Sequence, residues 1–343
     1  MIAEGQVGAR GAEQAVHTGG PSLLAALLAC SAVVLSPATS AQTGTEFPNR
    51  LVRIVCVNAP GGGLDIIGRL IADRLTKNLN QTVILENRSG AGGNIASEFV
   101  ARAPADGYTL LETTNNHNIN AFIYKAPGYN PRRDFVAVTQ VTEAPSVVVA
   151  GAQTSYRSLK DLIAAARAQP GKITYASGGN GQPTHIAGEM FKKAASIDLV
   201  HVPYKGGGPA TLDLVAGQVP VGMSALPSVT PHIQDGKLRA LAVTSDKRWP
   251  TLPDTPSVAE SGYPGYRHMT WIGILAPAGT PAAVIARLNK EIASVLANAD
   301  LRQRIVTVGA EPVASSSAEF EAMLKAEYEA TAKLVAEIGL KVD

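Results

Sequence analysis

Strand-like and helix-like segments alternate along almost the whole chain, and this alternation is the feature that most constrains the fold. Residues 51–57 (LVRIVCV) read as a strand, and Ile67, Ile71 and Leu75 then recur at the spacing of a helix packed on one face. Further strand-like segments follow in turn, namely QTVILE, YTLLETT, SVVVAG, KITYAS, LVHVPY, VGMSAL, LRALAVTS and WIGILAPAG. This order predicts an α/β fold with mainly parallel sheets covered by helices on both faces.

Length and charge limit the organisation and the function of the chain. Its 343 residues predict two domains, at roughly 150 residues each. The 30 Lys and Arg residues are almost balanced by 28 Asp and Glu residues, for a net charge of +2. Nucleic-acid binding depends on concentrated positive charge, so this balance argues against a nucleic-acid partner.

The first 41 residues predict a signal peptide. The apolar run at 23–35 has 13 residues, fewer than the ~20 that span a bilayer as a helix. Small residues at Thr39 and Ala41 predict cleavage before Gln42 and export to the periplasm. An alternative interpretation takes 27–30 as a lipobox with a lipid-anchored Cys30.

After cleavage Cys56 is the only cysteine in the sequence, and its apolar strand position indicates an inert core thiol.

Two glycine-rich turns, each between a strand and a helix, predict anion binding. The first contains Gly61, Gly62 and Gly63, and no GK[ST] follows it as in a Walker A motif. Free backbone N–H groups and the positive end of a helix dipole favour an anion there. Asp65 either contacts a ligand or caps its own helix.

The second turn lies in YASGGNGQPTHIAGE and contains Ser177, Gly179 and Gly181. It lacks the third glycine of a dinucleotide fingerprint, and Ser177 lacks the preceding glycine of a nucleophile elbow. His185 and Glu189 are one helical turn apart, but the remaining histidines form no spaced ligand set. We therefore expect no cofactor and no metal.

Two other polar segments follow predicted strands. TTNNHNIN brings Asn115, Asn116 and His117 together, as a heavily hydrogen-bonded turn or as a loop facing a polar ligand. VPYKGGG is a third glycine-rich turn, with Tyr204 and Lys205 either exposed or facing the ligand.

Together these motifs resemble the TctC or Bug family, the exported solute-binding proteins of tripartite tricarboxylate transporters. The resemblance covers nearly all of residues 47–343, through segments such as FPNRLVRIVCVNAPGGGLDIIGR, LENRSGAGGNIASEFVARAPADGYTLL, ITYASGGNGQPTHIAGEMF and VPYKGGGPATLDLVAGQV. It implies a two-lobed periplasmic binding protein of type II-like fold, in which two strands cross between lobes that close on a small carboxylate. With SVVVAG and WIGILAP as the crossing strands, the expected lobes are 47–143 plus 268–343, and 144–267.

The resemblance also implies a ligand site and partners. It places ligand contacts on the PGGG turn, the TNNHN loop, the SGGNG turn with Thr184 and His185, and Tyr204. The implied partners are the permease subunits of a tripartite transporter, and we expect a monomer. One departure is Pro220, because the family usually has Asp after GQV; this puts the loop through Met223 and Ser224, and with it the choice of ligand, in question.

These observations favour a binding protein over two alternatives. A binding protein needs hydrogen-bond donors and a hinge, and no nucleophile, base or metal. The alternatives are a ligand-binding sensor subunit that serves a signalling partner and an enzyme that uses Cys56, His185 or Ser177. The abundance of neutral donors predicts that amides of 61–63 and 179–181, aided by Ser177, hold the ligand carboxylate.

Overall fold

The computed structural model describes residues 47–341. The expected signal peptide and its cleavage point lie outside these residues. Within the described part of the chain, no helix is long and apolar enough to cross a membrane.

Strands and helices alternate as the sequence predicts. The strands are β1 (Val52–Cys56), β2 (Val83–Asn87), β3 (Thr109–Thr113), β4 (Phe135–Gly151), β5 (Thr174–Ser177), β6 (Val200–Pro203), β7 (Val221–Ala225), β8 (Leu238–Val243), β9 (Met269–Pro277) and β10 (Glu311–Pro312). The helices are α1 (Gly63–Leu79), α2 (Asn94–Ala101), α3 (Asn116–Ile123), α4 (Leu159–Ala168), α5 (Pro183–Ala195), α6 (Gly207–Val215), α7 (Leu226–Gln234), α8 (Ala282–Ala297), α9 (Ala299–Thr307) and α10 (Ser317–Ile338), with a 3₁₀ turn η1 (Ala91–Gly93).

The strands form one continuous mixed sheet with the order β2-β1-β3-β9-β4-β7-β5-β6, to which β8 and β10 are added by pairing with β4. Pairing is parallel within β1–β3 and within β5–β7, as expected. It is antiparallel wherever β4 or β9 takes part. The α/β class is therefore confirmed, and the antiparallel pairs arise because β4 and β9 run against their neighbours.

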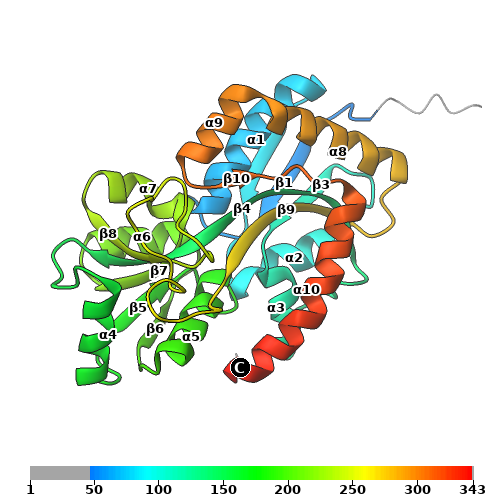
Figure 1. Ribbon diagram of the computed structural model, residues 1–343. Helices are drawn as coiled ribbons and strands as arrows, with labels where there is room; N and C mark the ends of the chain where they lie inside the picture. Colours follow the sequence, from blue (N-terminus) through cyan, green and yellow to red (C-terminus); the bar gives the residue numbers. More distant parts are fainter. Residues whose placement is uncertain (1–46, 342–343) are drawn as a thin grey trace, which may run out of the picture. The chain divides into compact units, whose positions relative to one another are not determined.

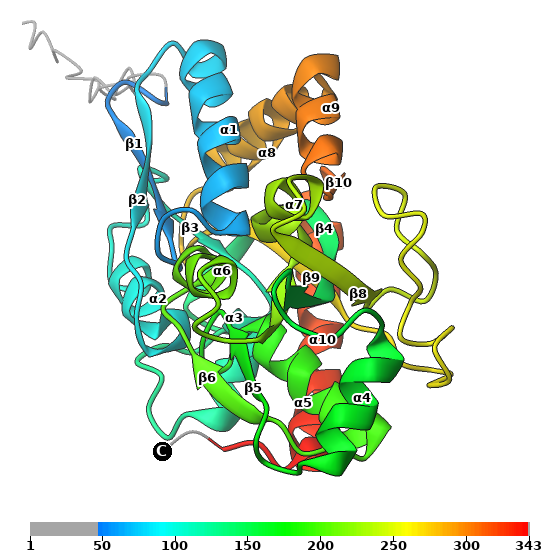
Figure 2. The same ribbon diagram turned by 90° about the vertical axis from the view of Figure 1, so that its left-hand side faces the viewer.

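β4 connects the two halves of the sheet. Its residues 135–145 pair with β9, and its residues 146–151 pair with β7 and β8. The strand is thus much longer than the SVVVAG segment alone. In Figures 1 and 2 it runs from the region of β9 and β10 to that of β7 and β8.

Separate hydrophobic clusters form on the two halves. One cluster uses residues from 52–144 and 271–324, with α1, α8 and α9 on one face of its sheet and α2, α3 and α10 on the other (Figure 1). Two further clusters use residues from 147–266, with α4 and α5 on one face and α6 and α7 on the other. A small fourth cluster joins α3, α5 and the end of α10.

Two segments differ from their expected role. TNNHN is the start of helix α3 and not a loop. Residues 251–268 form the predicted irregular connection, yet Val258 and Tyr266 within it are buried in a core cluster.

Candidate ligand-binding site

A small cavity lies where the carboxyl ends of four strands meet. Asn58 follows β1, Thr114 follows β3, Gly178 follows β5 and Ala225 ends β7, and all four residues line the cavity. The crevice beyond the carboxyl ends of strands is the usual ligand site of open α/β sheets. The remaining lining residues are Gly63, Leu64, Gln182, Pro183, Thr184, Gly207, Ala210, Met223, Ser224, Ser228 and Thr270.

Four helices begin at this cavity. The first residues of α1, α5 and α6 (Gly63, Pro183 and Gly207) line it, as do Ala225 and Ser228 at the start of α7. Each helix N-terminus carries roughly +0.5 of an elementary charge and several N–H groups without an intrahelical partner. None of the lining residues is Asp, Glu, Lys, Arg or His. The helix dipoles therefore contribute positive potential to a cavity whose own lining carries no charged side chain.

The two halves of the sheet touch across this cavity. The amide of Ala59 donates to the carbonyl of Lys205 at 3.0 Å, and the amide of Gly63 donates to Ser228 Oγ at 2.7 Å. A Cβ on Gly62 would lie 3.2 Å from the nitrogen of Gly207, so glycine permits this close approach. The cavity is small, about 30 Å³, whereas sites for organic ligands usually have roughly 300 Å³ or more, so the walls must separate to admit one.

Asp65 fixes the first glycine-rich turn. Its carboxylate accepts from the amide of Gly61 at 3.0 Å and from the Asn87 side chain at 2.9 Å, and it pairs with Arg69 at 2.8 Å. Burial acts to raise the pKa of Asp65, but these hydrogen bonds outweigh burial and the pKa is lowered. Asp65 is not among the residues that line the cavity. Of the predicted residues on this turn, Gly63 reaches the cavity.

The second glycine-rich turn is held by its own side chains. Ser177 Oγ lies 2.6 Å from His201 Nε2 and accepts from the amide of Gly179 at 3.1 Å. Thr184 Oγ1 accepts from the amide of Gly178 at 2.9 Å. Gly181 has a φ of +74°, and its amide donates to His185 Nδ1 at 3.3 Å.

The structure brings Thr184 and Gly178 of this turn to the cavity. Ser177, Gly179 and Gly181 are not among its lining residues, and their contact with a ligand stays a prediction. His185 stacks on His201 with ring centroids 3.9 Å apart. Burial is the main reason why the pKa of His185 falls to about 4 and that of His201 to about 3, so both rings are neutral at pH 7.

The asparagine run on α3 is heavily hydrogen-bonded. Asn115 donates to Glu327 at 2.7 Å, and its Oδ1 accepts from the amide of Trp271. Glu327 also accepts from Asn118 and from the indole of Trp271. Asn116 binds Thr114 and the carbonyl of Gly92.

His117 is buried beside the rings of Tyr129 and Phe135, and burial lowers its pKa to about 4. The asparagine run therefore supports the cavity wall. Thr114, which comes just before the run, is the residue that reaches the cavity.

Tyr204 also lies outside the lining. Its hydroxyl donates to Asp213 at 2.6 Å, and its pKa rises to about 12 because of burial and the neighbouring carboxylate. Pro220 precedes β7, whose opposite end carries Met223 to Ala225 at the cavity, so the proline itself is not a lining residue.

Sequence reasoning missed other parts of the lining. Ser228 and Thr270 carry no local motif, and they meet only because α7 and β9 converge at the cavity. The one available signal, for Ser228, was its place just after the carboxyl end of a predicted strand.

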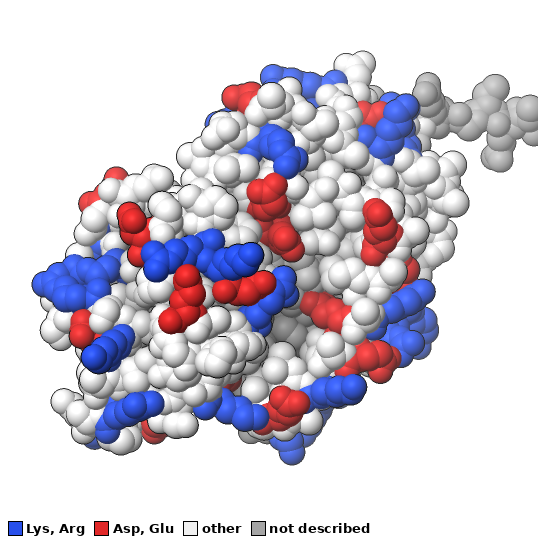
Figure 3. All heavy atoms as spheres, viewed as in Figure 1, with Lys and Arg blue, Asp and Glu red and all other residues white. Residues whose placement is uncertain are grey.

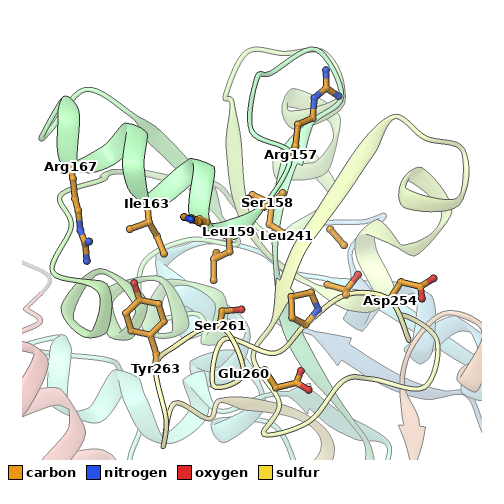
Figure 4. A pocket seen from close by; sticks show the side chains of 14 residues that line it. Arg157, Ser158, Leu159, Ile163, Arg167, Leu241, Asp254, Glu260, Ser261 and Tyr263 are labelled. Carbon is orange, nitrogen blue, oxygen red and sulfur yellow. The ribbon is translucent and has the colours of Figure 1, made fainter.

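A larger cavity of about 710 Å³ lies between α4, β8 and residues 254–263. Its lining includes Arg157, Lys160 and Arg167 from the α4 side and Asp254 and Glu260 opposite. Figure 4 shows that the charged ends of Arg157, Arg167, Asp254 and Glu260 lie at separate edges and do not converge. The charged surface in Figure 3 likewise mixes both signs. This cavity lacks the convergent donors of the smaller one.

The fold and the small cavity define an α/β solute-binding protein, because backbone donors from both halves of the sheet converge there without a titratable side chain. The chain belongs to the tripartite tricarboxylate transporter family of receptors (TctC), whose family model matches residues 67–340. The expected family membership is confirmed.

Relatives and solved structures agree with this assignment. A UPF0065 protein from the tcbD-tcbE intergenic region of Pseudomonas sp. (strain P51) is 38% identical over 89% of this chain and 91% of that protein. Protein BugT of Bordetella pertussis is 33% identical over 86% of this chain and 91% of that protein. The structure of R. palustris Rpa4515 with adipate is 35% identical, covers 86% of this chain and 99% of that chain, and has a TM-score of 0.83. MatC from Rhodopseudomonas palustris with bound malate is 30% identical, covers 84% of this chain and 100% of that chain, and has a TM-score of 0.80.

Proposed function

We propose that this protein is the periplasmic receptor of a tripartite transporter and that it captures a small dicarboxylate in the cavity between its two halves. The observation that carries the proposal is the meeting of four helix N-termini at a cavity lined without charged side chains. Four N-termini at roughly +0.5 each supply about +2, which matches the charge of a dicarboxylate better than that of a monocarboxylate. Two solved relatives hold adipate and malate, both of which are dicarboxylates.

The proposed working cycle uses two lobes, 47–143 plus 268–343, and 144–267. The separate hydrophobic clusters support this division, since each lobe then has its own core. Bending of β4, and of the chain just before β9, where they pass between the lobes would open the cavity to the ligand. Closing would bring Gly63 of one lobe back to Ser228 of the other.

The proposed setting is the periplasm, reached through cleavage of the signal peptide before Gln42. There the loaded monomer would deliver its ligand to the membrane permease subunits. The ligand would leave chemically unchanged, because no Asp, Glu, Lys, Arg, His or Cys lines the cavity to act as a base or to activate one of its hydroxyl groups. Mass spectrometry of the exported protein tests the leader, and a mass that retains residues 1–41 or a lipid on Cys30 contradicts it.

Calorimetry with matched acids tests the proposed function. Adipate and malate are compared with hexanoate and 3-hydroxybutyrate, each of which is the same molecule with one carboxylate replaced by a methyl group. We expect at least one dicarboxylate to bind at least tenfold more tightly than its monocarboxylate partner, and to be recovered unaltered. Equal affinities for both classes, or no binding of any of the four, would overturn the proposal.

A further inference from the structure

Two hydroxyl groups in the wall of the small cavity have hydrogen-bonding capacity that the surrounding protein does not use. Thr270 is 6% exposed, and its Oγ1 has no hydrogen-bond partner among residues 47–341. Ser228 is 5% exposed and accepts from the amide of Gly63, but its own proton has no acceptor within the same residues. Both residues line the cavity. A buried polar group without a partner is unusual in a folded protein and calls for a ligand or another explanation.

A hydrogen bond links the Ser228 hydroxyl to the N-terminus of α1. The first amide of α1, on Gly63, donates to Ser228 Oγ at 2.7 Å, a short distance for an N–H···O bond. A hydroxyl that accepts a hydrogen bond becomes a better donor, because hydrogen bonds in a chain polarise one another. Ser228 also lies in the first turn of α7, so an anion in contact with its hydroxyl lies near the N-terminal ends of two helices.

Thr270 is held in place by its neighbours on β9. The Asn115 side chain donates to the carbonyl of Met269 and accepts from the amide of Trp271, the two residues that flank Thr270. Side chains alternate along a strand, so fixing both flanking residues also fixes the direction of Thr270. This clamp also gives Asn115 a positioning role behind the cavity wall.

We propose that Ser228 and Thr270 are specificity-determining ligand contacts that donate their hydroxyl protons to one carboxylate of the bound dicarboxylate. This assignment rests on the proposed function and adds the residues that recognise one end of the ligand. The other carboxylate faces the α5 N-terminus with Thr184 and Gln182. A hydrogen bond to a charged group is among the stronger ones in proteins, so loss of either donor weakens binding measurably.

Calorimetry with adipate, malate and monomethyl adipate tests the assignment on four variants. Ser228→Ala removes one hydroxyl, and Thr270→Val removes the other while keeping the shape of the side chain. Ser155→Ala is the matched control, since Ser155 is an exposed serine outside the cavity lining. We expect Ser228→Ala and Thr270→Val each to weaken binding of the dicarboxylate by about ten- to a hundredfold. Ser155→Ala should leave it unchanged, and Thr270→Ser should restore most of the affinity.

The half-ester separates ligand contact from a purely structural effect. Monomethyl adipate has a single carboxylate, which can face α5, so each variant should weaken its binding less than about threefold. A structural role for the Ser228–Gly63 bond would instead weaken adipate and its half-ester by the same factor, and that result would overturn the assignment. Unchanged dicarboxylate affinity in both variants would also overturn it while leaving the proposed function intact. A wild-type protein that binds neither adipate nor malate would overturn the assignment together with the dicarboxylate proposal.

Discussion

Replacement of Gly179 by alanine, which adds one methyl group to the second glycine-rich turn, should lower the free energy of unfolding strongly. Gly179 has a φ of +122°, a backbone conformation that residues with a side chain rarely adopt. A Cβ at this position would lie 2.3 Å from the carbonyl oxygen of Tyr204. That oxygen belongs to the backbone, so it cannot move aside as the end of a flexible side chain could.

Gly262 provides a control with similar backbone geometry and no steric contact. Its φ is +105°, and a Cβ there would meet nothing within 4 Å. Backbone strain of roughly 1–3 kcal/mol, less about 0.4–1 kcal/mol from the more restricted unfolded chain, applies to both replacements. The overlap at Gly179 adds about 1–3 kcal/mol. We therefore expect a loss in the free energy of unfolding of about 1–2 kcal/mol for Gly262→Ala and about 2–5 kcal/mol for Gly179→Ala.

Urea denaturation followed by circular dichroism measures both losses. Binding of the ligand should also weaken in Gly179→Ala, because the neighbouring Gly178 lines the cavity, and should be unaffected in Gly262→Ala. Equal losses of stability in the two variants would refute the steric argument, since backbone strain alone would then account for the effect.

Two further predictions concern buried carboxyl groups. Glu112 is fully buried, and burial raises its pKa to about 8. The folded protein therefore holds a proton that the unfolded chain releases above pH ~4.5, and stability should fall as the pH rises from about 5 to 8, by up to about 1.4 kcal/mol per pH unit. Urea unfolding at several pH values should show this slope flattened in Glu112→Gln; parallel slopes would contradict the expectation. Glu327→Leu removes the acceptor of the Asn115 and Asn118 amides and of the Trp271 indole N–H. It should lower the free energy of unfolding by about 3–5 kcal/mol, whereas Glu329→Leu, at an exposed position, should lower it by less than about 1 kcal/mol. Similar midpoints for these two variants in thermal unfolding would exclude the buried network.

Much of the fold could be predicted from the sequence because its signals are local. Apolar periodicity and glycine-rich turns locate most strands and helices, and β1, β5 and α5 begin or end close to the expected residues. The start of α3 could not be predicted, because an asparagine run usually indicates a turn. In the structure those amides bond to Glu327 on α10 and to Gly92, and these distant partners stabilise a helix there.

The candidate site was predicted in part. Gly63 and Thr184 were expected and reach the cavity, because each stands at a strand-to-helix turn whose helix N-terminus points inward. Ser177, His185, His117 and Tyr204 were expected as ligand contacts, yet each has a partner within the protein. The sequence shows that these side chains are polar, but it does not show which way each side chain points. A polar residue that supports a turn and one that faces a ligand have the same letter in the sequence.

The sequence by itself determined the α/β class, the order of the elements and the presence of glycine-rich turns between strands and helices, since hydrophobic period and glycine placement are properties of neighbouring residues. Only the tertiary structure decided which groups face the cavity. Ser228 accepts a hydrogen bond from the amide of Gly63, which is 165 positions away in the sequence. Thr270 lies on β9, a strand late in the chain that pairs with β3 and β4. Contacts of that separation depend on how the strands are ordered in the sheet and on which way each one runs. Those two properties arise from packing among distant segments and leave no pattern in the residues around either hydroxyl.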